Sequence, residues 1–244
     1  MIRRPKRPRG VLLYDGPSML DGSGIIAVAV RTSDNEKTGN MVQVYILARD
    51  IHPVEAIKQG RKMGTCGYCP LLGDICYVRP EQAPTAVWHG NNRGIYPVYD
   101  KAQHGYLFKN RKVRWGADGD PAALPLRIMH KINRLASGHT GYSHQLFWID
   151  RKRADKLAKL LMVSCENPAQ EAECTRRNWR AFRVKSKDQP LLPGEIDCPH
   201  YTHNVQCIDC GLCDGADGKS PKHIAVTVHG ITSKVSKFEA MVTS

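Results

Sequence analysis

The sequence predicts an α/β protein, with a (β/α)8-like barrel, irregular in places, as the expected architecture and an open doubly wound sheet as the alternative. Strand-like and helix-like segments alternate through the second half of the chain, which is typical of parallel strands joined by crossover helices. The length of 244 residues is close to the ~250 residues usual for such barrels. A composition of 41% apolar and 24% charged residues excludes a wholly disordered chain.

Three strand-like segments open the chain, at residues 11–14, 25–31 and 41–48. Each is an apolar or alternating run rich in Val, Ile and Tyr, which favours a β-strand. Asp34, Asn35 and Gly39 supply the turn residues that a hairpin between the last two segments requires. Residues 53–59 then predict a short helix, and a cysteine-rich loop follows.

The second half of the chain repeats a strand–helix unit. Short strands are expected at 113–115, 161–164, 181–184 and 224–228, with an extended segment at 139–148. One helix is expected from residue 121 to about 136 and another over 151–161, both with apolar residues at helical spacing. Asn167 and Pro168 are typical of a further helix start, with Gln170 placed for a capping box.

These elements predict a flexible basic arm over residues 1–10 and a single barrel-like domain over 11–244. Metal-binding insertions are expected within the domain at about 64–80 and 195–216. No apolar run approaches the ~18 residues of a membrane span, and no signal-peptide apolar stretch follows the basic start. We therefore expect a soluble, cytoplasmic protein with no membrane partner.

The net charge of +13 is concentrated in two stretches. Residues 1–10 hold five basic residues and no acid, and residues 151–187 hold eleven basic and four acidic residues. Such a bias indicates a polyanionic partner, DNA or RNA, although a solubilising tail is the alternative for the arm. A polar and aromatic loop over 88–93 could stack on a base and grip a phosphate. The predicted nucleic-acid contacts are Arg3, Arg4, Lys6, Arg7, Arg9, Arg93, Arg151, Lys152, Arg153, Arg176, Arg177 and Arg180.

Four cysteines near the C-terminus have the spacing of a metal site: Cys198, Cys207, Cys210 and Cys213. The C-x2-C-x2-C core brings three sulfurs around one point, and Cys198 can return from its loop as the fourth ligand. Four thiolates suit Zn2+ and also a [4Fe–4S] cluster, with His200 and His203 nearby as spare ligands. Disulfides are disfavoured in a cytoplasmic chain.

A second group, Cys66, Cys69 and Cys76, supplies only three thiolates, in C-x2-C-x6-C order. A histidine, a substrate or a cysteine of the later group could complete the ligand set. Three cysteines with an open position fit a radical S-adenosylmethionine (SAM) cluster, although the usual C-x3-C-x2-C spacing is absent; a structural zinc site is the alternative. Cys165 and Cys174 are expected to be buried apolar residues.

Candidate catalytic groups follow the predicted strands, where parallel-sheet enzymes place their sites. Asp15 follows the first strand, and Asp118 and Asp120 lie on a glycine-rich loop after another. Two carboxylates there could divide nucleophilic and acid/base roles, although Asp120 also has the position of a helix cap. His144 is a candidate proton shuttle or phosphate contact, and Glu166 follows the strand at 161–164. The plainer alternatives are a turn aspartate at 15 and a structural histidine at 144.

At these motifs the sequence resembles a family of cysteine-rich phage proteins. The resemblance covers roughly residues 60–230. It rests on TCGYCPL with CYV, APTAVWHG, RWGADGDPAALP, HTGYSHQ, MVSCENPAQEAECTRRNWRAFRV and the closing C-x2-C-x-L-C-D-G with IAVTVHG.

The sequence is also similar to the tRNA-guanine transglycosylase superfamily, in particular its phage branch that acts on DNA, the DpdA type. A superfamily motif, D-S-G-G-F-Q after the first strand, is matched in part by Asp15-Gly16-Pro17-Ser18. The resemblance implies a (β/α)8 barrel, a cysteine-bound structural zinc and two catalytic aspartates. It further implies exchange of guanine in DNA for a 7-deazaguanine base such as preQ0.

Under this leading hypothesis Asp118 or Asp120 attacks C1′ of the deoxyribose to form a covalent intermediate, and Asp15 serves as acid/base. The zinc braces the DNA-contacting loop. One alternative is an iron–sulfur, radical SAM-like enzyme acting on nucleic acid. The other is a non-catalytic zinc-containing protein that binds DNA.

Overall fold

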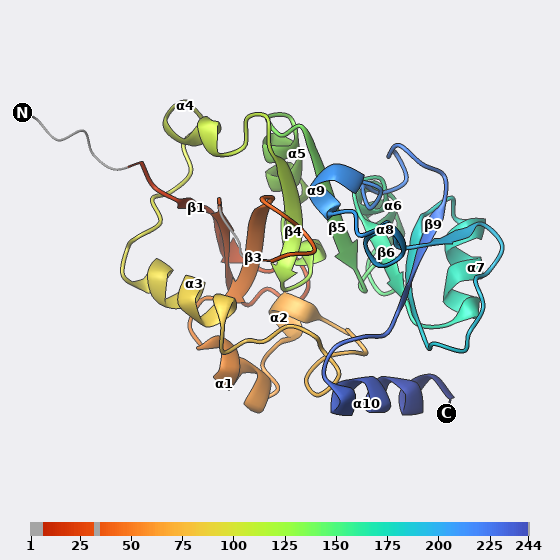
Figure 1. Ribbon diagram of the computed structural model, residues 1–244. Helices are drawn as coiled ribbons and strands as arrows, with labels where there is room; N and C mark the ends of the chain where they lie inside the picture. The colour runs from red at the N-terminus through yellow and green to blue at the C-terminus, as the bar shows by residue number, and fades with distance from the viewer. Residues whose placement is uncertain (1–6, 32–34, 244) are drawn as a thin grey trace, which may run out of the picture.

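The computed structural model describes residues 7–31 and 35–243, and it is built on one mixed sheet of nine strands. The strand order is β1-β2-β3-β4-β5-β6-β7-β9-β8, and helices lie on both sides of the sheet (Figure 1). The predicted α/β class is confirmed at this level. The predicted basic arm lies mostly outside the described residues.

The first three strands form two antiparallel hairpins: β1 (Gly10–Pro17), β2 (Gly24–Val30) and β3 (Val42–Ala48). This confirms the strands predicted there. β1 is longer than expected, because it continues through a register shift between Leu12 and Tyr14. Asp15 therefore lies inside an edge strand, paired with Ile26, and not in the loop after it.

The remaining strands run parallel: β4 (Lys112–Asp118), β5 (Gly138–Ser143), β6 (Met162–Cys165), β7 (Ala181–Lys185), β8 (Glu195–Asp197) and β9 (His223–Thr227). From β3 to β7 each strand pairs in parallel with the next along the chain, as in a barrel. The sheet nevertheless ends at β1 on one side and at the three-residue β8 on the other. The structure is therefore an open sheet and no closed barrel, because antiparallel hairpins occupy the place of the first strand–helix units. It is not doubly wound either, because the order from β3 to β7 does not reverse.

One face of the sheet is covered by α5 (Leu126–Asn133), α6 (Arg151–Ala158) and α7 (Pro168–Arg176). Their apolar faces share a core with Trp115, Val163 and other fully buried strand residues. The predicted cap of α7 is confirmed, since the Asn167 side chain accepts from the Gln170 N–H. The helix expected from residue 121 is broken into a 3-10 turn, Pro121–Ala123, and α5, with Pro125 at the boundary.

The opposite face is covered by the C-terminal cysteine segment and by α3. Met162, Ile224 and Val226 pack with Cys198 and Cys213, because neighbouring residues along a strand point to opposite faces. The segment contains α8 (Pro199–His203) and α9 (Cys207–Cys210). Further along, α3 (Ala83–Asn92) packs on β2 and β3. The loop predicted at 88–93 is thus mostly helix.

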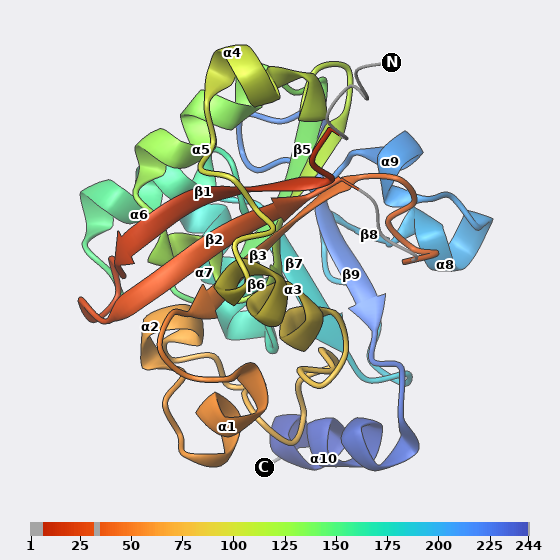
Figure 2. The ribbon, with the colours of Figure 1, turned by 90° about the vertical axis from the view of Figure 1, so that its left-hand side faces the viewer.

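Several helices gather at the edge where the parallel strands end: α1 (Pro53–Lys58), α2 (Met63–Cys66) and the C-terminal α10 (Thr232–Thr243) (Figures 1 and 2). α1 was predicted; α10, β8 and the short α4 (Lys101–His104) were not. Among the described residues, no helix combines the length and apolar character needed to cross a bilayer.

Candidate functional site

The carboxyl edge of the parallel strands collects four of the predicted catalytic side chains. Asp118 ends β4, Asp120 follows two residues later, His144 follows β5 and Glu166 follows β6. The three acidic residues are 5–7% exposed, and the His144 side chain is 17% exposed. Parallel strands bring these positions together although the sequence separates them by up to 48 residues.

His144 joins the edge to the first cysteine group. Its Nδ1 lies 3.4 Å from the Cys69 Sγ, and its Nε2 lies 2.6 Å from the Glu166 Oε1. The His144 backbone N–H donates to Asp120 Oδ2 at 2.9 Å. Burial alone would lower the pKa of His144, but the hydrogen bonds with Cys69 and Glu166 outweigh it and raise that pKa well above its usual range. The two contacts of its ring fix a Cys69–His144–Glu166 hydrogen-bonded chain at the carboxyl edge of the strands.

A buried ion pair lies on the other side of the same cysteines. Lys62 Nζ is 3.5 Å from Asp118 Oδ1, and the two side chains are only 4% and 7% exposed. Asp118 Oδ2 is buried without a hydrogen-bond partner among the described residues. Burial opposes the charge of Lys62, but Asp118, Cys66 and Cys76 raise its pKa. Lys62 therefore keeps a positive charge against the thiols.

The turn that carries Cys66 and Cys69 is clamped by Gln145. Its Oε1 accepts from the Tyr68 N–H at 2.9 Å, and its Nε2 donates to the Cys66 carbonyl at 2.8 Å. Gly67 is required between them, because its φ is +52° and a Cβ there would lie 2.1 Å from Gln145 Oε1. Cysteines 66 and 69 are thus held at the edge by a side chain from the loop after β5.

Burial strongly affects the thiols of this group. It raises the pKa of Cys66 to about 12, against the opposing effect of Lys62, and it also raises the pKa of Cys76. A thiol with such a pKa becomes a thiolate at neutral pH only when a cation offsets its charge, as a bound metal does.

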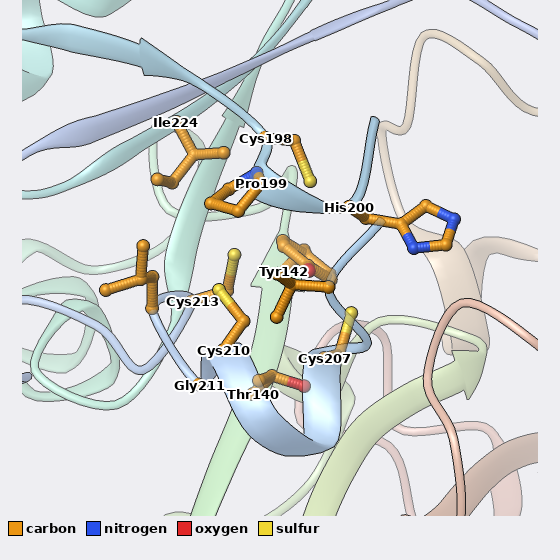
Figure 3. Close-up of a pocket in the computed structure, with 12 residues that line it drawn as sticks. Thr140, Tyr142, Cys198, Pro199, His200, Cys207, Cys210, Gly211, Cys213 and Ile224 are labelled. Carbon is orange, nitrogen blue, oxygen red and sulfur yellow. The ribbon is translucent and has the colours of Figure 1, made fainter. Parts of the chain in front are cut away.

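The four later cysteines surround a separate cavity on the sheet face, not at its edge. Figure 3 shows the side chains of Cys198, Cys207, Cys210 and Cys213 around one space, with Tyr142 among them. The cavity is only about 10 Å³. Its walls are fixed to the sheet, since the Cys198 N–H donates to Ala225 and the Cys213 carbonyl accepts from Gly141.

Cationic and phenolic groups approach these sulfurs. Burial raises the pKa of Cys213 to about 12, while a hydrogen bond from Tyr142 acts in the opposite direction. Lys37 and Arg114 interact electrostatically with Cys207 and lower its pKa, although burial dominates and raises it. These cations would offset the negative charge of four thiolates on one divalent ion.

The structure places neither cysteine group in closed ligand geometry. Within residues 7–31 and 35–243, no three His, Cys, Asp or Glu side chains converge as a bound metal ion requires. Metal binding by either group would therefore involve rotation of cysteine side chains. Cys165 and Cys174, in contrast, are fully buried with sulfurs 3.6 Å apart, as expected for residues of the core.

The prediction that Arg180 contacts nucleic acid is wrong, because its side chain is buried. It is 3% exposed and its guanidinium donates to the carbonyls of Leu212, Gly215 and Lys222 and to Asp214. It holds the end of the four-cysteine loop.

Most other residues of the second basic stretch that were predicted to contact nucleic acid also form hydrogen bonds or ion pairs within the protein. Arg153 donates to two backbone carbonyls, and Arg151 pairs with Asp155. Arg176 and Arg177 pair with Glu173. Arg151 and Arg176 are nevertheless exposed, at 53% and 72% of the side chain. Lys152, Arg93, Arg7 and Arg9 are exposed as well, whereas Arg3, Arg4 and Lys6 lie outside the described residues.

Asp15 does not join the other carboxylates. It pairs with Arg49 at 3.0 Å and is 43% exposed. β1 and β4 are separated by β2 and β3, so at ~4.8 Å per strand Asp15 lies roughly 14 Å across the sheet from Asp118.

Comparison with family models, with curated proteins and with solved structures gave no match. The site is therefore interpreted from its own geometry. Sequence reasoning missed Lys62 and Gln145; the first directly precedes the cysteine turn and the second directly follows His144, so adjacency to a candidate ligand was the signal available.

Proposed function

We propose that this protein is an iron–sulfur enzyme of the radical SAM kind that modifies nucleic acid. Cys66, Cys69 and Cys76 would hold the cluster. The observation that carries the proposal is the place of these three thiols, at the carboxyl edge of the parallel strands beside Lys62–Asp118 and His144–Glu166. That edge is where parallel-sheet proteins place their reactive groups.

The two cysteine groups differ as catalytic and structural sites differ. Catalytic metal sites keep a position free of protein ligands, whereas structural sites are closed by four. Cys66, Cys69 and Cys76, which we call the edge group, number three, whereas the face group has four cysteines. The face group consists of Cys198, Cys207, Cys210 and Cys213. A cluster held by three cysteines can bind SAM at its remaining iron and supply radical chemistry.

The residues around the edge group suit a cluster. Hydrogen bonds to ligand sulfurs tune the reduction potential of iron–sulfur centres. Lys62 and His144 both reach ligand sulfurs, and Glu166 fixes the orientation of the imidazole. These contacts would offset the negative charge that three thiolates bring to a buried position.

For the face group we propose a structural zinc ion. Four cysteines line one cavity, and four thiolates give the closed ligand set that is typical of a structural zinc site. Such an ion would tie the cysteine segment to the sheet. It takes no part in the chemistry at the edge.

An exposed aromatic pair beside the edge group supports a nucleic-acid substrate. Tyr68 and Trp148 are 65% and 63% exposed, and their ring centroids are 6.1 Å apart. Tyr68 neighbours Cys69, and Trp148 lies four residues after His144. Aromatic platforms of this kind stack on bases, and the chain has a net charge of +13 to attract phosphates.

Base exchange through an aspartate remains an untested prediction, and the geometry favours it less. Asp15 is roughly 14 Å from Asp118 by strand spacing. Asp120 is occupied by the N–H groups of Ala122 and His144. Asp118 keeps one oxygen, Oδ2, without a hydrogen-bond partner in the described part of the chain, while its other oxygen pairs with Lys62.

The proposal is tested on protein purified without oxygen. We expect a brown preparation with iron and sulfide in the ratio of a [4Fe–4S] cluster, and reductive cleavage of SAM to methionine and 5′-deoxyadenosine after addition of dithionite. Cys69→Ser is expected to abolish both. Cys165→Ser, at a buried cysteine outside both groups, is the matched control and should keep both.

A colourless protein that contains zinc alone and leaves SAM intact would overturn the proposal. Tight, salt-sensitive DNA binding by such a protein, with no altered bases, would instead support the non-catalytic zinc protein. A covalent protein–DNA adduct that forms with preQ0 and disappears in the Asp118→Ala, Asp120→Ala double variant would support base exchange.

A further inference from the structure

A second cavity, of about 460 Å³, opens next to Cys76. Its lining includes Ile75 and Tyr77, the two neighbours of Cys76, and residues 228–231, which follow β9. Lys234 from α10 also lines the cavity and donates to the Cys76 carbonyl. The volume falls within the range of small-molecule sites, and Figure 2 shows β9 leading into α10 at this edge.

The lining of the cavity carries positive charge: none of its residues is acidic, and two of them, Arg79 and Lys234, are cations. The nearby carboxylate of Asp74 pairs with Lys237 at 2.6 Å and also interacts electrostatically with Lys234. In the described part of the chain no carboxylate pairs with Arg79 or Lys234. α10 begins at Thr232, directly after Ile231 of the lining. The positive end of the α10 dipole therefore borders a cavity that already carries two cations.

The walls of the cavity offer a flat aromatic surface. Tyr77 is 58% exposed, and its hydroxyl accepts from the buried Arg114 at 2.6 Å. His229, which also lines the cavity, is fixed by a 2.5 Å hydrogen bond with the Tyr201 hydroxyl. Ile75, Val228 and Ile231 supply apolar surface between them. Aromatic walls and cations together are suited to a planar base joined to a phosphate.

We propose that this cavity binds one nucleotide, with its phosphate at Arg79 and Lys234 and its base against Tyr77. The inference rests on the proposed function in one respect, since it places the substrate nucleotide beside the third cysteine of the edge group. A nucleotide turned out of a polynucleotide and a free nucleoside monophosphate share this chemistry. The experiment separates these two sources.

The test measures binding of two probes to the full chain: adenosine 5′-monophosphate and a single-stranded oligodeoxynucleotide. Arg79→Gln and Tyr77→Ala are each expected to lower, by about tenfold, the affinity for whichever probe the wild type binds more tightly. Arg127→Gln removes the same charge from an exposed position on α5, and it should bind as the wild type does. Tighter binding of the oligonucleotide identifies the polynucleotide source; tighter binding of the monophosphate identifies the free one.

Photocross-linking with a 5-iododeoxyuridine oligonucleotide gives a readout that does not depend on variant stability. For a polynucleotide source we expect the adduct on the peptide that contains Tyr77, and its loss in Arg79→Gln. Tyr77→Phe keeps the ring and should retain most of the affinity.

Equal affinity of Arg79→Gln, Tyr77→Ala and Arg127→Gln for both probes would overturn the inference. Iron content and SAM cleavage in the same preparations report separately on the proposed function. A brown, SAM-cleaving protein whose binding ignores Arg79 would refute the cavity assignment alone. A colourless protein with Arg79-dependent binding would refute the cluster alone.

Discussion

Replacement of Arg180 by methionine should destabilise the protein through the four-cysteine loop. The guanidinium is buried, pairs with Asp214 at 2.9 Å and donates to three backbone carbonyls at 2.7–3.0 Å. Removing one partner of a buried ion pair lowers the free energy of unfolding by about 3–5 kcal/mol. At roughly 2–4 °C per kcal/mol for a chain of this size, the melting temperature should fall by about 10 °C.

The loop should also hold the proposed zinc ion less tightly, because supporting contacts of this kind change metal affinity by about 10–100-fold. Thermal unfolding and competition with a chelator measure the two effects. Arg176→Met is the matched control. Its side chain is 72% exposed and pairs only with Glu173, so we expect a loss of less than about 1 kcal/mol. An Arg180→Met protein that has the melting temperature of the wild type but binds DNA poorly would refute this structural role.

Three further outcomes follow from buried or exposed groups. Asp120→Ala should lower the free energy of unfolding by about 2–4 kcal/mol, since two N–H groups, one from His144, lose their acceptor; Asp120→Asn, which keeps an acceptor, should recover about half in urea unfolding. Burial lowers the pKa of His223, whose Nδ1 accepts a hydrogen bond from the Ala181 N–H. As the pH falls, the unfolded chain therefore takes up a proton at this histidine before the folded protein does. The contribution of neutral His223 to the free energy of unfolding is complete above about pH 6.5 and decreases below it by up to ~1.4 kcal/mol per pH unit. His223→Gln should flatten that slope, and an unchanged slope would contradict the assignment. Trp148→Ala should weaken oligonucleotide binding by about 1–3 kcal/mol with an unchanged circular dichroism spectrum; equal affinity would remove the aromatic pair from the substrate surface.

Local patterns predicted much of the secondary structure. Alternating apolar residues located β2, β3 and β4, and Asn167 marked the start of α7. The predicted closed barrel is absent from the described part of the chain, and such patterns could not show this, because closure depends on how the edge strands pair. Here the 97–99 segment binds β1, with the Leu12 N–H donating to Pro97, and the three-residue β8 ends the other side.

The site was predicted in part for the same reason. Asp118 ends a strand and Asp120, His144 and Glu166 follow one, and parallel pairing brings these four residues to one edge. Arg180 was misassigned because charge alone does not distinguish a surface arginine from one that binds carbonyls inside a loop.

Lys62 was missed for a comparable reason. Its partner Asp118 lies 56 residues away in the sequence, and no local pattern joins the two side chains. Lys62 precedes α2 and Asp118 ends β4, so the pair becomes visible only when α2 packs at the edge of the sheet.

The most direct test of the account is metal and sulfide analysis, with the visible spectrum, of wild-type, Cys69→Ser and Cys207→Ser proteins purified without oxygen. We predict iron, sulfide and zinc in the wild type, loss of iron and colour with zinc retained in Cys69→Ser, and loss of zinc with iron retained in Cys207→Ser. A wild-type protein without iron, or one that loses both metals equally in either variant, would contradict the assignment of a catalytic cluster to the edge and a structural ion to the face.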